Sequence, residues 1–347
     1  MLFATRRSDP PAMTLEGVLG PNTRLDDAAG IAVDAPNAVC VIEGLGLLFS
    51  SGSAVLAIEA WDARPTPWAV FDDTVTAIGG GPDGLVAVGL AGGGLAVCDR
   101  NGAAAGWTAP AAGPAAIADL AFLPDGAVAA VDSGYGPGDD MFARAPWDDR
   151  ARGSVTSVRR DGATRQLASG LHCPTGIALD GSGAPLVTLF ERAAVAELSG
   201  QLRQSGYPAY PGRIRRTDTG YLIACLARRD PLIEFLKTER DFVAEMKQSI
   251  EPRYWISPRM HPEFSHDFPI EAGATRLFGE IKPWAPSFSY GLVIETDERL
   301  VPTASAHSRA NGLRHAISDA VCWNGDIIAV SRASGEVLRI GAGGTVQ

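Results

Sequence analysis

The sequence predicts an all-β protein, a six-bladed β-propeller with a helical cap inserted in blade five. Apolar runs of four to six residues alternate with turns in a chain of 347 residues that contains 40 Gly and 24 Pro, a composition typical of many short strands. A pattern of a corner, an apolar strand, a Gly-containing turn and further strands returns six times, as in a radial repeat protein. One long interruption with helical spacing predicts the cap.

Each repeat predicts one four-stranded blade, so residues 1–347 are expected to form a single propeller domain. Turns between the first two strands of a repeat contain Gly or Asn, which supply the positive φ that tight hairpins need. Because the last repeat has three strands, the segment near "MTLEGVLG" (13–20) is expected to add the fourth and close the ring. The repeats begin at Pro36, Val75, Ile117, Pro174, Gly212 and Ile317, and the turns include Pro82-Asp83-Gly84, Pro124-Asp125-Gly126 and Asn324-Gly325.

Two insertions interrupt the repeats. Residues 134–153 lie between the second and third strands of blade three and are expected to form a loop on one face. Residues 228–289 interrupt blade five and begin with Asp230-Pro231, an N-cap followed by Pro at the first helical position. Apolar residues at helical spacing predict one amphipathic helix from Asp230 to Ile250. This helix either packs as a cap over one end of the propeller or contacts a membrane or a partner.

Charge and composition exclude several classes of function. The net charge is −10 and Lys and Arg form no stripe, so neither nucleic acids nor anionic membranes are expected partners. No apolar segment has the length of a signal-peptide core or a membrane span, and a cytoplasmic location is expected. An odd number of widely spaced cysteines favours buried thiols over disulfides or a zinc site. They are Cys40, Cys98, Cys173, Cys225 and Cys322.

Four stretches of the chain carry a resemblance to a known family. They are "GLHCPTGIALDGSG", "GYPAYPGRIRRTDTGYLIACLARRDPLIEFL", "SYGLVIETDERLVPTASAHSRANG" and "ISDAVCWNGDIIAVS". They resemble the strictosidine synthase-like branch of the six-bladed propellers, which also include the gluconolactonases and paraoxonases; the last two resemble the adipocyte plasma membrane-associated proteins of that branch. The resemblance implies fold and branch but not the reaction, because this fold hosts lactone hydrolysis, Pictet–Spengler condensation and other roles.

In this family the corner residue before each innermost strand faces the central tunnel, where the ligand site lies. The metal-dependent lactonases have Glu, Asn and Asp at such corners, oxygen ligands that suit calcium. Asn37 and Asp119 would be metal ligands here, but Thr175 and Arg213 stand where the family has Asn and Asp-Asn. A guanidinium repels a divalent cation, so a degraded metal site is expected and no certain cofactor is predicted, with calcium as the alternative. The corners are Asn37, Thr76, Asp119, Thr175, Arg213 and Asp319.

The plant condensing enzymes of the family use a carboxylate on the innermost strand of the final blade as acid and base. Ser318 stands near that position and Asp319 beside it. Asp119 and Asp319 could therefore be paired carboxylates across the tunnel, one acting as an acid while the other stays ionised. Alternatively, each accepts backbone N–H bonds at its own corner. Arg213 could bind a substrate carboxylate or phosphate, or form a salt bridge to either aspartate.

Histidines and aromatic residues are further candidates. His172 is a candidate for the tunnel mouth, whereas Cys173 points to the opposite face of its strand and belongs to the core. His315, four residues before Asp319, could orient that carboxylate or, like His307, be exposed to solvent. The remaining candidates are expected to be solvated turns, lid surface, or aromatic groups that either roof a substrate or anchor the insertion. They are Glu43, Asp180, Tyr254, Trp255, His261, His266, Asp267 and Trp284.

The sequence supports two hypotheses on function. The first is an enzyme that acts on a small organic molecule in the tunnel, a lactone or ester hydrolase or a strictosidine synthase-like lyase, with Asp319, Asp119 and Ser318 as catalytic residues. No nucleophile elbow, Walker loop or zinc-protease motif indicates another reaction. The second is a non-catalytic propeller that binds a metabolite or a partner protein. If the corner of Thr175 is part of the site, Arg213 is expected to supply the positive charge that calcium supplies in the lactonases. The expected binding residues are Asn37, Thr76, Thr175, Arg213, His172 and His315.

Overall fold

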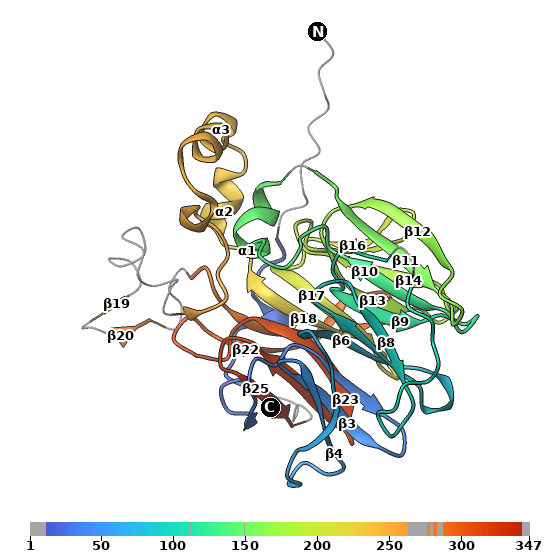
Figure 1. Ribbon diagram of the computed structural model, residues 1–347. Coiled ribbons are helices and arrows are strands. Elements are labelled where there is room, and N and C mark those ends of the chain that lie inside the picture. Colours follow the sequence, from blue (N-terminus) through green and yellow to red (C-terminus); the bar gives the residue numbers. More distant parts are fainter. Residues whose placement is uncertain are drawn as a thin grey trace.

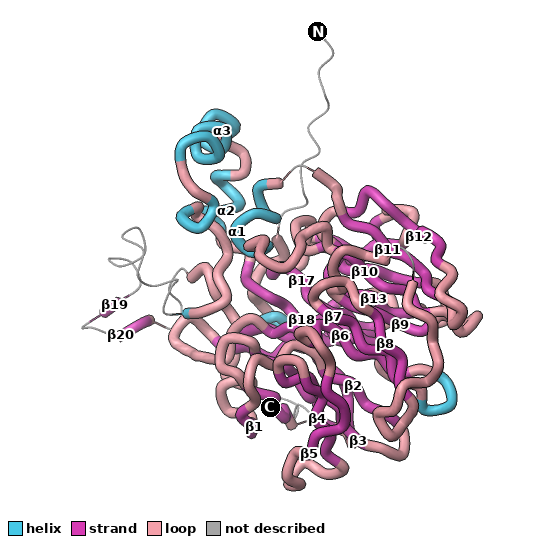
Figure 2. Tube along the Cα trace, viewed as in Figure 1, coloured by secondary structure: helices cyan, strands magenta, loops and turns pink. Residues whose placement is uncertain are grey.

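The computed structural model describes residues 12–110, 113–148, 150–262, 276–277, 280–282 and 287–341. Antiparallel sheets are arranged around a central axis, and the helices gather at one side of this ring (Figure 1; Figure 2). The prediction of an all-β, six-bladed propeller is therefore confirmed. No helix in the described part of the chain is long and apolar enough to cross a membrane.

The blades follow the sequence order. Blade one contains β2 (Val39–Ile42), β3 (Gly46–Ser51), β4 (Ala54–Ile58) and β5 (Thr66–Val70); blade two, β6 (Val75–Gly80), β7 (Val86–Leu90) and β8 (Leu95–Cys98). Blade three contains β9 (Asp119–Phe122), β10 (Val128–Asp132), β11 (Gly153–Val158) and β12 (Thr164–Leu171); blade four, β13 (Pro174–Leu179), β14 (Pro185–Leu189), β15 (Ala194–Glu197) and β16 (Leu202–Ser205). Blade five contains β17 (Ala209–Arg216), β18 (Gly220–Arg228), β21 (Gly291–Asp297) and β22 (Pro302–Ser308); blade six, β23 (Ile317–Trp323), β24 (Asp326–Ser331), β25 (Glu336–Ile340) and β1 (Ala29–Ala32).

The core is a ring of apolar clusters between neighbouring blades. Blade one packs on blade two through Ile42 and Leu48 against Ile78 and Val88, and the other five interfaces repeat this arrangement. Alternating strand residues supply these contacts, because both faces of each blade are covered by a neighbour. The packing of blades around an axis brings the first residues of the innermost strands together at its centre.

Two details of the blades differ from the prediction. Blade two has three strands in the described residues, and its outer edge adds only a single bridge between Cys98 and Ala104. The strand that closes blade six is β1, and not the segment 13–20, which forms a short 3-10 turn, η1 (Gly17–Leu19), against blade five. A Cβ at Gly30 would lie 2.4 Å from Oε1 of Glu336, so a larger residue there would displace the end of that side chain.

The long insertion lies between β18 and β21. It forms two helices, α2 (Pro231–Leu236) and α3 (Arg240–Ser249), and a short turn, η4 (Pro252–Tyr254), so the prediction of one continuous helix is wrong. Asp230 is the N-cap of α2, since its side chain accepts a hydrogen bond of 2.8 Å from the amide of Leu232. The helix ends where the Thr238 hydroxyl donates to the carbonyl of Phe235 at 2.7 Å, a local bond that competes with helical pairing. A two-stranded ladder, β19 (Arg276–Leu277) with β20 (Glu280–Ile281), also lies in the insertion.

The helices α2 and α3 stand on the loop of blade three, which contains α1 (Met141–Arg144) and η3 (Ala145–Trp147). Trp147 packs with Ile233, Met246 and Trp255 in one apolar cluster. Its indole Nε1 donates to Ser257 Oγ at 2.7 Å, so both insertions are joined by a buried polar contact as well. The two insertions therefore lie on the same face of the propeller.

Candidate functional site

The centre of the tunnel is occupied by the side chain of Arg213. β17 carries a register shift between Pro211 and Ile214, and such a bulge re-aims the side chain of the extra residue. Gly176 of blade four lets this bulge approach, because a Cβ at that position would lie 2.7 Å from Cα of Arg213. Glycine in the corner Pro174-Thr175-Gly176 is thus required by the backbone of the next blade.

The guanidinium of Arg213 binds carbonyl oxygens of four blades. Nη1 donates to Asn37 O at 2.6 Å and to Ser318 O at 3.2 Å. Nη2 donates to Ala118 O at 2.8 Å and also to the carbonyl of Thr76. The side chain is 5% exposed. A ring of carbonyl oxygens with two carboxylates beside it is the environment that a hard cation would take, and here a guanidinium occupies it.

A second arginine, Arg215, lies next to Arg213 along the axis. It binds Asp119 through two parallel bonds of 2.7 and 2.8 Å and Asp319 through one of 2.9 Å. Nε of Arg213 lies 3.3 Å from Asp119 and 3.8 Å from Asp319. Burial opposes the charge of Arg215, but the two carboxylates outweigh it and raise the pKa of Arg215. These four side chains, which we call the arginine–aspartate plug, carry no net charge.

The buried aspartates are bound on several sides. Asp119 accepts the amide of Ile177 at 2.8 Å, and Asp319 accepts those of Val39 at 3.2 Å and Ala320 at 3.0 Å. Each carboxylate therefore joins its own blade to a neighbour as well as to the arginines. The salt bridge to Arg213 considered from the sequence is observed. A backbone N–H bond at the residue's own corner is observed for Asp319, whereas the N–H that Asp119 accepts belongs to the next blade. The carboxylates are 0% exposed, which speaks against a role as acid and base for a substrate.

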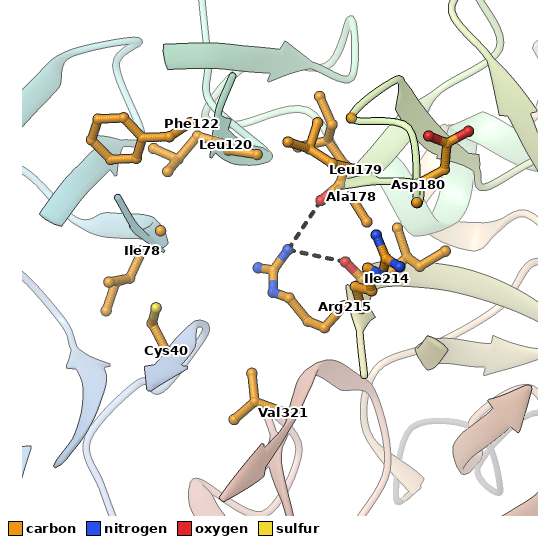
Figure 3. Close-up of a pocket in the computed structure, with 17 residues that line it drawn as sticks. Cys40, Ile78, Leu120, Phe122, Ala178, Leu179, Asp180, Ile214, Arg215 and Val321 are labelled. Atoms are coloured by element: carbon orange, nitrogen blue, oxygen red, sulfur yellow. Dashed lines mark hydrogen bonds between the residues drawn. The ribbon is translucent and has the colours of Figure 1, made fainter. Parts of the chain in front are cut away.

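The plug separates two cavities. The mouth pocket has a volume of 210 Å³ and opens on the face of the insertions, since Tyr135 and Met141 of the blade-three loop line it. The base pocket, at the other end of the innermost strands, has a volume of 500 Å³. Figure 3 shows Arg215 in the base pocket among the apolar side chains of Ile78, Leu120 and Val321. There Arg215 also donates to the carbonyls of Ile177 and Ile214, so its donors are taken up by the protein.

Three corner residues, Asn37, Thr76 and Thr175, line the mouth pocket around Arg213, and so does Ser318, which precedes the corner residue Asp319. Thr175 donates to Pro211 O at 2.8 Å and lies 3.1 Å from the hydroxyl of Thr188, so it joins blade four to blade five. Ser318 donates to Asn37 O at 2.7 Å and joins blade six to blade one. Both hydroxyls are thus bound to neighbouring blades, and the expected role of Thr175 in holding a ligand in the tunnel is not favoured.

Asn37 and Thr76 present unused polar groups to the mouth pocket. Oγ1 of Thr76 is buried and has no hydrogen-bond partner among the described residues. Across the same described ranges, the side-chain amide of Asn37 also makes no hydrogen bond to protein. A buried polar group without a partner is costly, so these two groups are the ones that a bound molecule would satisfy.

Arg332 is a residue of the mouth pocket that the sequence interpretation missed. It lies in the turn between β24 and β25, and its guanidinium forms no hydrogen bond or ion pair with any other residue that the structure describes. Burial and the nearby charge of Arg213 lower the pKa of Arg332 to about 10. It therefore remains a cation at neutral pH. The sequence "SRASGEV" reads as an ordinary hairpin turn, and only the fold brings this turn to the tunnel.

The histidine candidates lie outside the mouth pocket. His172 pairs with Glu191, a residue of the turn after β14, and is 17% exposed. His315 is buried, with one ring nitrogen 2.9 Å from Ser289 Oγ and the other 2.9 Å from Arg309 O. Its ring nitrogens are therefore engaged away from Asp319. The expected solvent exposure of His307 and His315 is wrong, since both are 0% exposed.

The remaining candidates divide between surface and core. Cys173 is buried, as expected, but Cys322 is exposed because it lies on the outward face of β23 near the hairpin. Trp255 anchors the insertion in its apolar cluster, while Tyr254 is 54% exposed. Glu43 and His261 are exposed, and Asp180 lies in a hairpin turn where it accepts backbone N–H bonds. His266, Asp267 and Trp284 lie outside the described residues.

The arrangement of side chains at the axis bears on whether a metal ion could bind there. In the part of the chain that the structure describes, no three His, Cys, Asp or Glu side chains come together as a metal site would require. Asn37 and Asp119, the metal ligands considered from the sequence, both contact Arg213, Asn37 through its carbonyl and Asp119 through its carboxylate. The residues present at the axis thus fit a guanidinium better than a divalent cation.

Comparisons with known proteins show the class of fold. The chain is similar to a gluconolactonase from Xanthomonas campestris, with a TM-score of 0.54 and 13% identity over 96% of this chain and 95% of that chain. A virginiamycin B lyase from Staphylococcus aureus has a TM-score of 0.52 and 11% identity over 90% and 98%. The PQQ-bound aldose sugar dehydrogenase from Streptomyces coelicolor has a TM-score of 0.50 and 12% identity over 90% and 95%.

These neighbours define the protein as a six-bladed propeller of the architecture that gluconolactonases share. No family model matches the chain. A search of curated proteins likewise gives no match. At 11–13% identity the likeness shows the fold alone, so the function is argued from the site.

Proposed function

We propose that the protein is a metal-independent relative of the lactonase-type propellers that binds a small organic molecule in the mouth pocket. The observation that carries this proposal is the position of Arg213, whose guanidinium takes up carbonyls of four blades directly beneath the pocket. The positive charge that calcium would supply at the axis is thus supplied by the chain itself. The narrower placement in the strictosidine synthase-like branch rests on the four sequence stretches and belongs to this proposal.

The polar lining supports binding of a ligand more directly than acid–base chemistry. Asn37, Thr76 and Arg332 face the pocket with unused hydrogen-bonding capacity, whereas Asp119 and Asp319 lie in the plug beneath Arg213. Ser318, near the position of the plant carboxylate, is bound to Asn37 O. The non-catalytic alternative, a propeller that binds a metabolite, is therefore the form of the proposal that this geometry favours.

A calcium titration tests the absence of a metal requirement. If a site with a dissociation constant of about 1 mM were present, about 10 mM calcium would add about 1.4 kcal/mol to stability and raise the melting temperature. We expect no rise with calcium and no fall with a chelator. A calcium-dependent rise that is lost in Asp119→Asn would overturn the metal-independent reading.

A thermal-shift screen of metabolites tests the pocket itself. Compounds that stabilise the wild-type protein should lose their effect in Ala91→Trp, because Ala91 lines the mouth pocket and the larger side chain fills it. Ala163→Trp, at an exposed position away from both pockets, is the matched control. Hits that Ala91→Trp retains would place the ligand elsewhere.

Hydrolysis of a lactone or ester is a second candidate. It is favoured by one observation: Arg332, Thr76 and Asn37 are three groups that could donate hydrogen bonds to a carbonyl oxygen as it gains negative charge. A similar propeller from Xanthomonas campestris is a gluconolactonase. Turnover of a panel of lactones, followed by acid release without calcium and lost in Arg332→Met, would support this candidate.

A further inference from the structure

The mouth pocket has an uneven charge that indicates the class of its ligand. Arg213 and Arg332 are the charged residues among those that line it. The charge of Arg213 is balanced within the plug by Asp119 and Asp319. Arg332 has no counter-charge among the described residues, so the pocket carries one net positive charge in a protein whose overall charge is −10.

The unused polar groups of the pocket are all hydrogen-bond donors. A guanidinium donates only, and a threonine hydroxyl and an asparagine amide each have a hydrogen to give. Oγ1 of Thr76 is buried without a partner in the described structure, although its own carbonyl is bound by Arg213. A ligand that accepts a hydrogen bond from each of the three groups at once presents closely spaced acceptor atoms, as a carboxylate does.

The three unused donors and the largest apolar side chains of the pocket come from different blades. Asn37, Thr76 and Arg332 come from blades one, two and six, whereas Tyr135, Met141 and Leu226 come from the blade-three loop and blade five. A molecule that places its acid group toward blades six, one and two therefore lays its remaining atoms against an apolar wall. The volume of 210 Å³ lies below the roughly 300 Å³ at which pockets for drug-sized ligands begin.

We propose that Arg332, with Thr76 and Asn37, forms a subsite for the carboxylate of a small organic acid. This inference rests on the proposed function of the mouth pocket and names the chemical class of its ligand. Arg332 binds the anion directly and is distinct from Arg213, whose Nη1 and Nη2 donate to carbonyls and whose Nε lies 3.3 Å from the carboxylate of Asp119. The subsite would not accept an organic cation, because Arg332 would repel it at short distance.

The test compares acids with their primary amides, which keep shape but remove the charge. Binding of acetate, lactate and benzoate, and of acetamide, lactamide and benzamide, is measured by calorimetry in the full chain. We expect at least one acid to bind about tenfold or more tightly than its amide, the size of effect that a charge-assisted hydrogen bond gives. Arg332→Met should abolish this preference while the weaker binding of the amide remains, and Arg332→Lys should retain part of it.

Matched variants keep the test specific. Arg165→Met removes one positive charge from the exposed strand β12, away from the pocket, and should leave the preference unchanged. Thr76→Val, which keeps shape and removes the hydroxyl, should weaken acid binding severalfold. Melting temperatures check folding: because the side chain of Arg332 has no partner in the described structure, Arg332→Met should melt at the wild-type temperature or above it.

The outcomes separate the two proposals. If an amide binds as tightly as its acid, or if Arg332→Met keeps the preference, the carboxylate subsite is refuted while ligand binding by the pocket stands. If neither acids nor amides bind and the screen against Ala91→Trp also gives no pocket ligand, the proposed function fails together with the subsite. A large fall in melting temperature in Arg332→Met would assign this residue a structural role and would also refute the subsite.

Discussion

Two arginines and two aspartates meet on the axis of the propeller, far apart in sequence and close in space. Three members of this cluster could be predicted from the sequence, because Arg213, Asp119 and Asp319 are corner residues of repeats. Arg215 was missed although it lies two residues after Arg213, a spacing that puts both side chains on one side of a strand. Arg332 had no such signal, because it lies in the turn between the second and third strands of its blade and not at a corner before an innermost strand.

Replacement of Arg213 should destabilise the protein strongly. Arg213→Met removes the bonds to carbonyls of four blades and leaves two buried aspartates with Arg215 alone. Breaking a buried charged pair costs about 3–5 kcal/mol, and we expect a loss of that order in urea unfolding. The control is Arg216→Met on the same strand, whose contact with Glu298 is 4.0 Å long and solvent-exposed and contributes about 0–1 kcal/mol. Equal stability of the two variants would contradict this account of the axis.

His307 should make stability depend on pH. Burial, with Arg228, Arg309 and Arg24 nearby, lowers the pKa of His307 from 6.5 to about 4. Between these values the unfolded chain binds a proton that the native protein does not. The contribution of His307 to the free energy of unfolding is therefore fully present above pH 6.5. It is lost as the pH falls toward 4, by up to about 3 kcal/mol.

The corresponding experiment measures urea unfolding of wild type and His307→Gln at several pH values from 7 to about 4. The variant should lose less stability over this range, because glutamine does not titrate. His261→Gln, at an exposed position, serves as the control and should follow the wild-type curve. Parallel curves for wild type and His307→Gln would show that His307 is not the group responsible.

At the scale of elements, the hydrophobic spacing of the long insertion did not predict that its helical region is divided into two helices. The sequence predicted the N-cap at Asp230 and the helical spacing after it. It did not predict the break at residues 237–239, because the apolar spacing continues across the break. The break follows from local bonding by Thr238 and from packing of both helices on Trp147. Trp147 belongs to another insertion, about eighty residues earlier in the chain, so sequence neighbours carried no information about this contact.

Docking of the helices on the blade-three loop should depend on Ile233. Ile233→Ala removes a side chain that is 0% exposed in the cluster of Trp147, Met246 and Trp255. Such a change costs about 2–5 kcal/mol where the surroundings stay in place, and here it should appear as faster hydrogen exchange over residues 231–255. Phe235→Ala, on the same helix but 59% exposed, should leave exchange nearly unchanged. Protection that survives in Ile233→Ala would mean that the cluster does not hold the helices.

At the scale of the molecule, the ring is closed by a strand from the beginning of the described chain. β1 pairs with β25 from Ala29–Arg339 to Ala32–Glu336. Arg314 secures this closure, since its Nη1 donates to the carbonyls of Leu25, Asp26 and Ala28 within 3.0 Å while Nε and Nη2 bind Glu336. One side chain thus holds the N-terminal segment against blade six.

Loss of this arginine should weaken the whole propeller. Arg314→Met leaves three carbonyls and one carboxylate without their donor, and we expect the free energy of unfolding to fall by about 2–4 kcal/mol. Arg339→Met is the control, because that side chain is 40% exposed, lies 3.7 Å from Asp326 and stands over the ring of Trp61, contacts of small value at an exposed site. A single cooperative transition at lower denaturant is expected for Arg314→Met; an unchanged midpoint would count against closure by this residue.

The sequence by itself determined the repeat, the six blades and the sites of both insertions, because alternation, turn residues and helix caps act over a few residues. It also identified the corner residues, since a periodic fold brings equivalent positions to one axis. Only the tertiary structure decided that Ser318 and Thr175 bind neighbouring blades, that β1 rather than residues 13–20 closes the ring, and that Arg332 faces the mouth pocket. These outcomes depend on which backbone groups of other blades lie within reach of a side chain, and those distances are set by the packing of the whole ring.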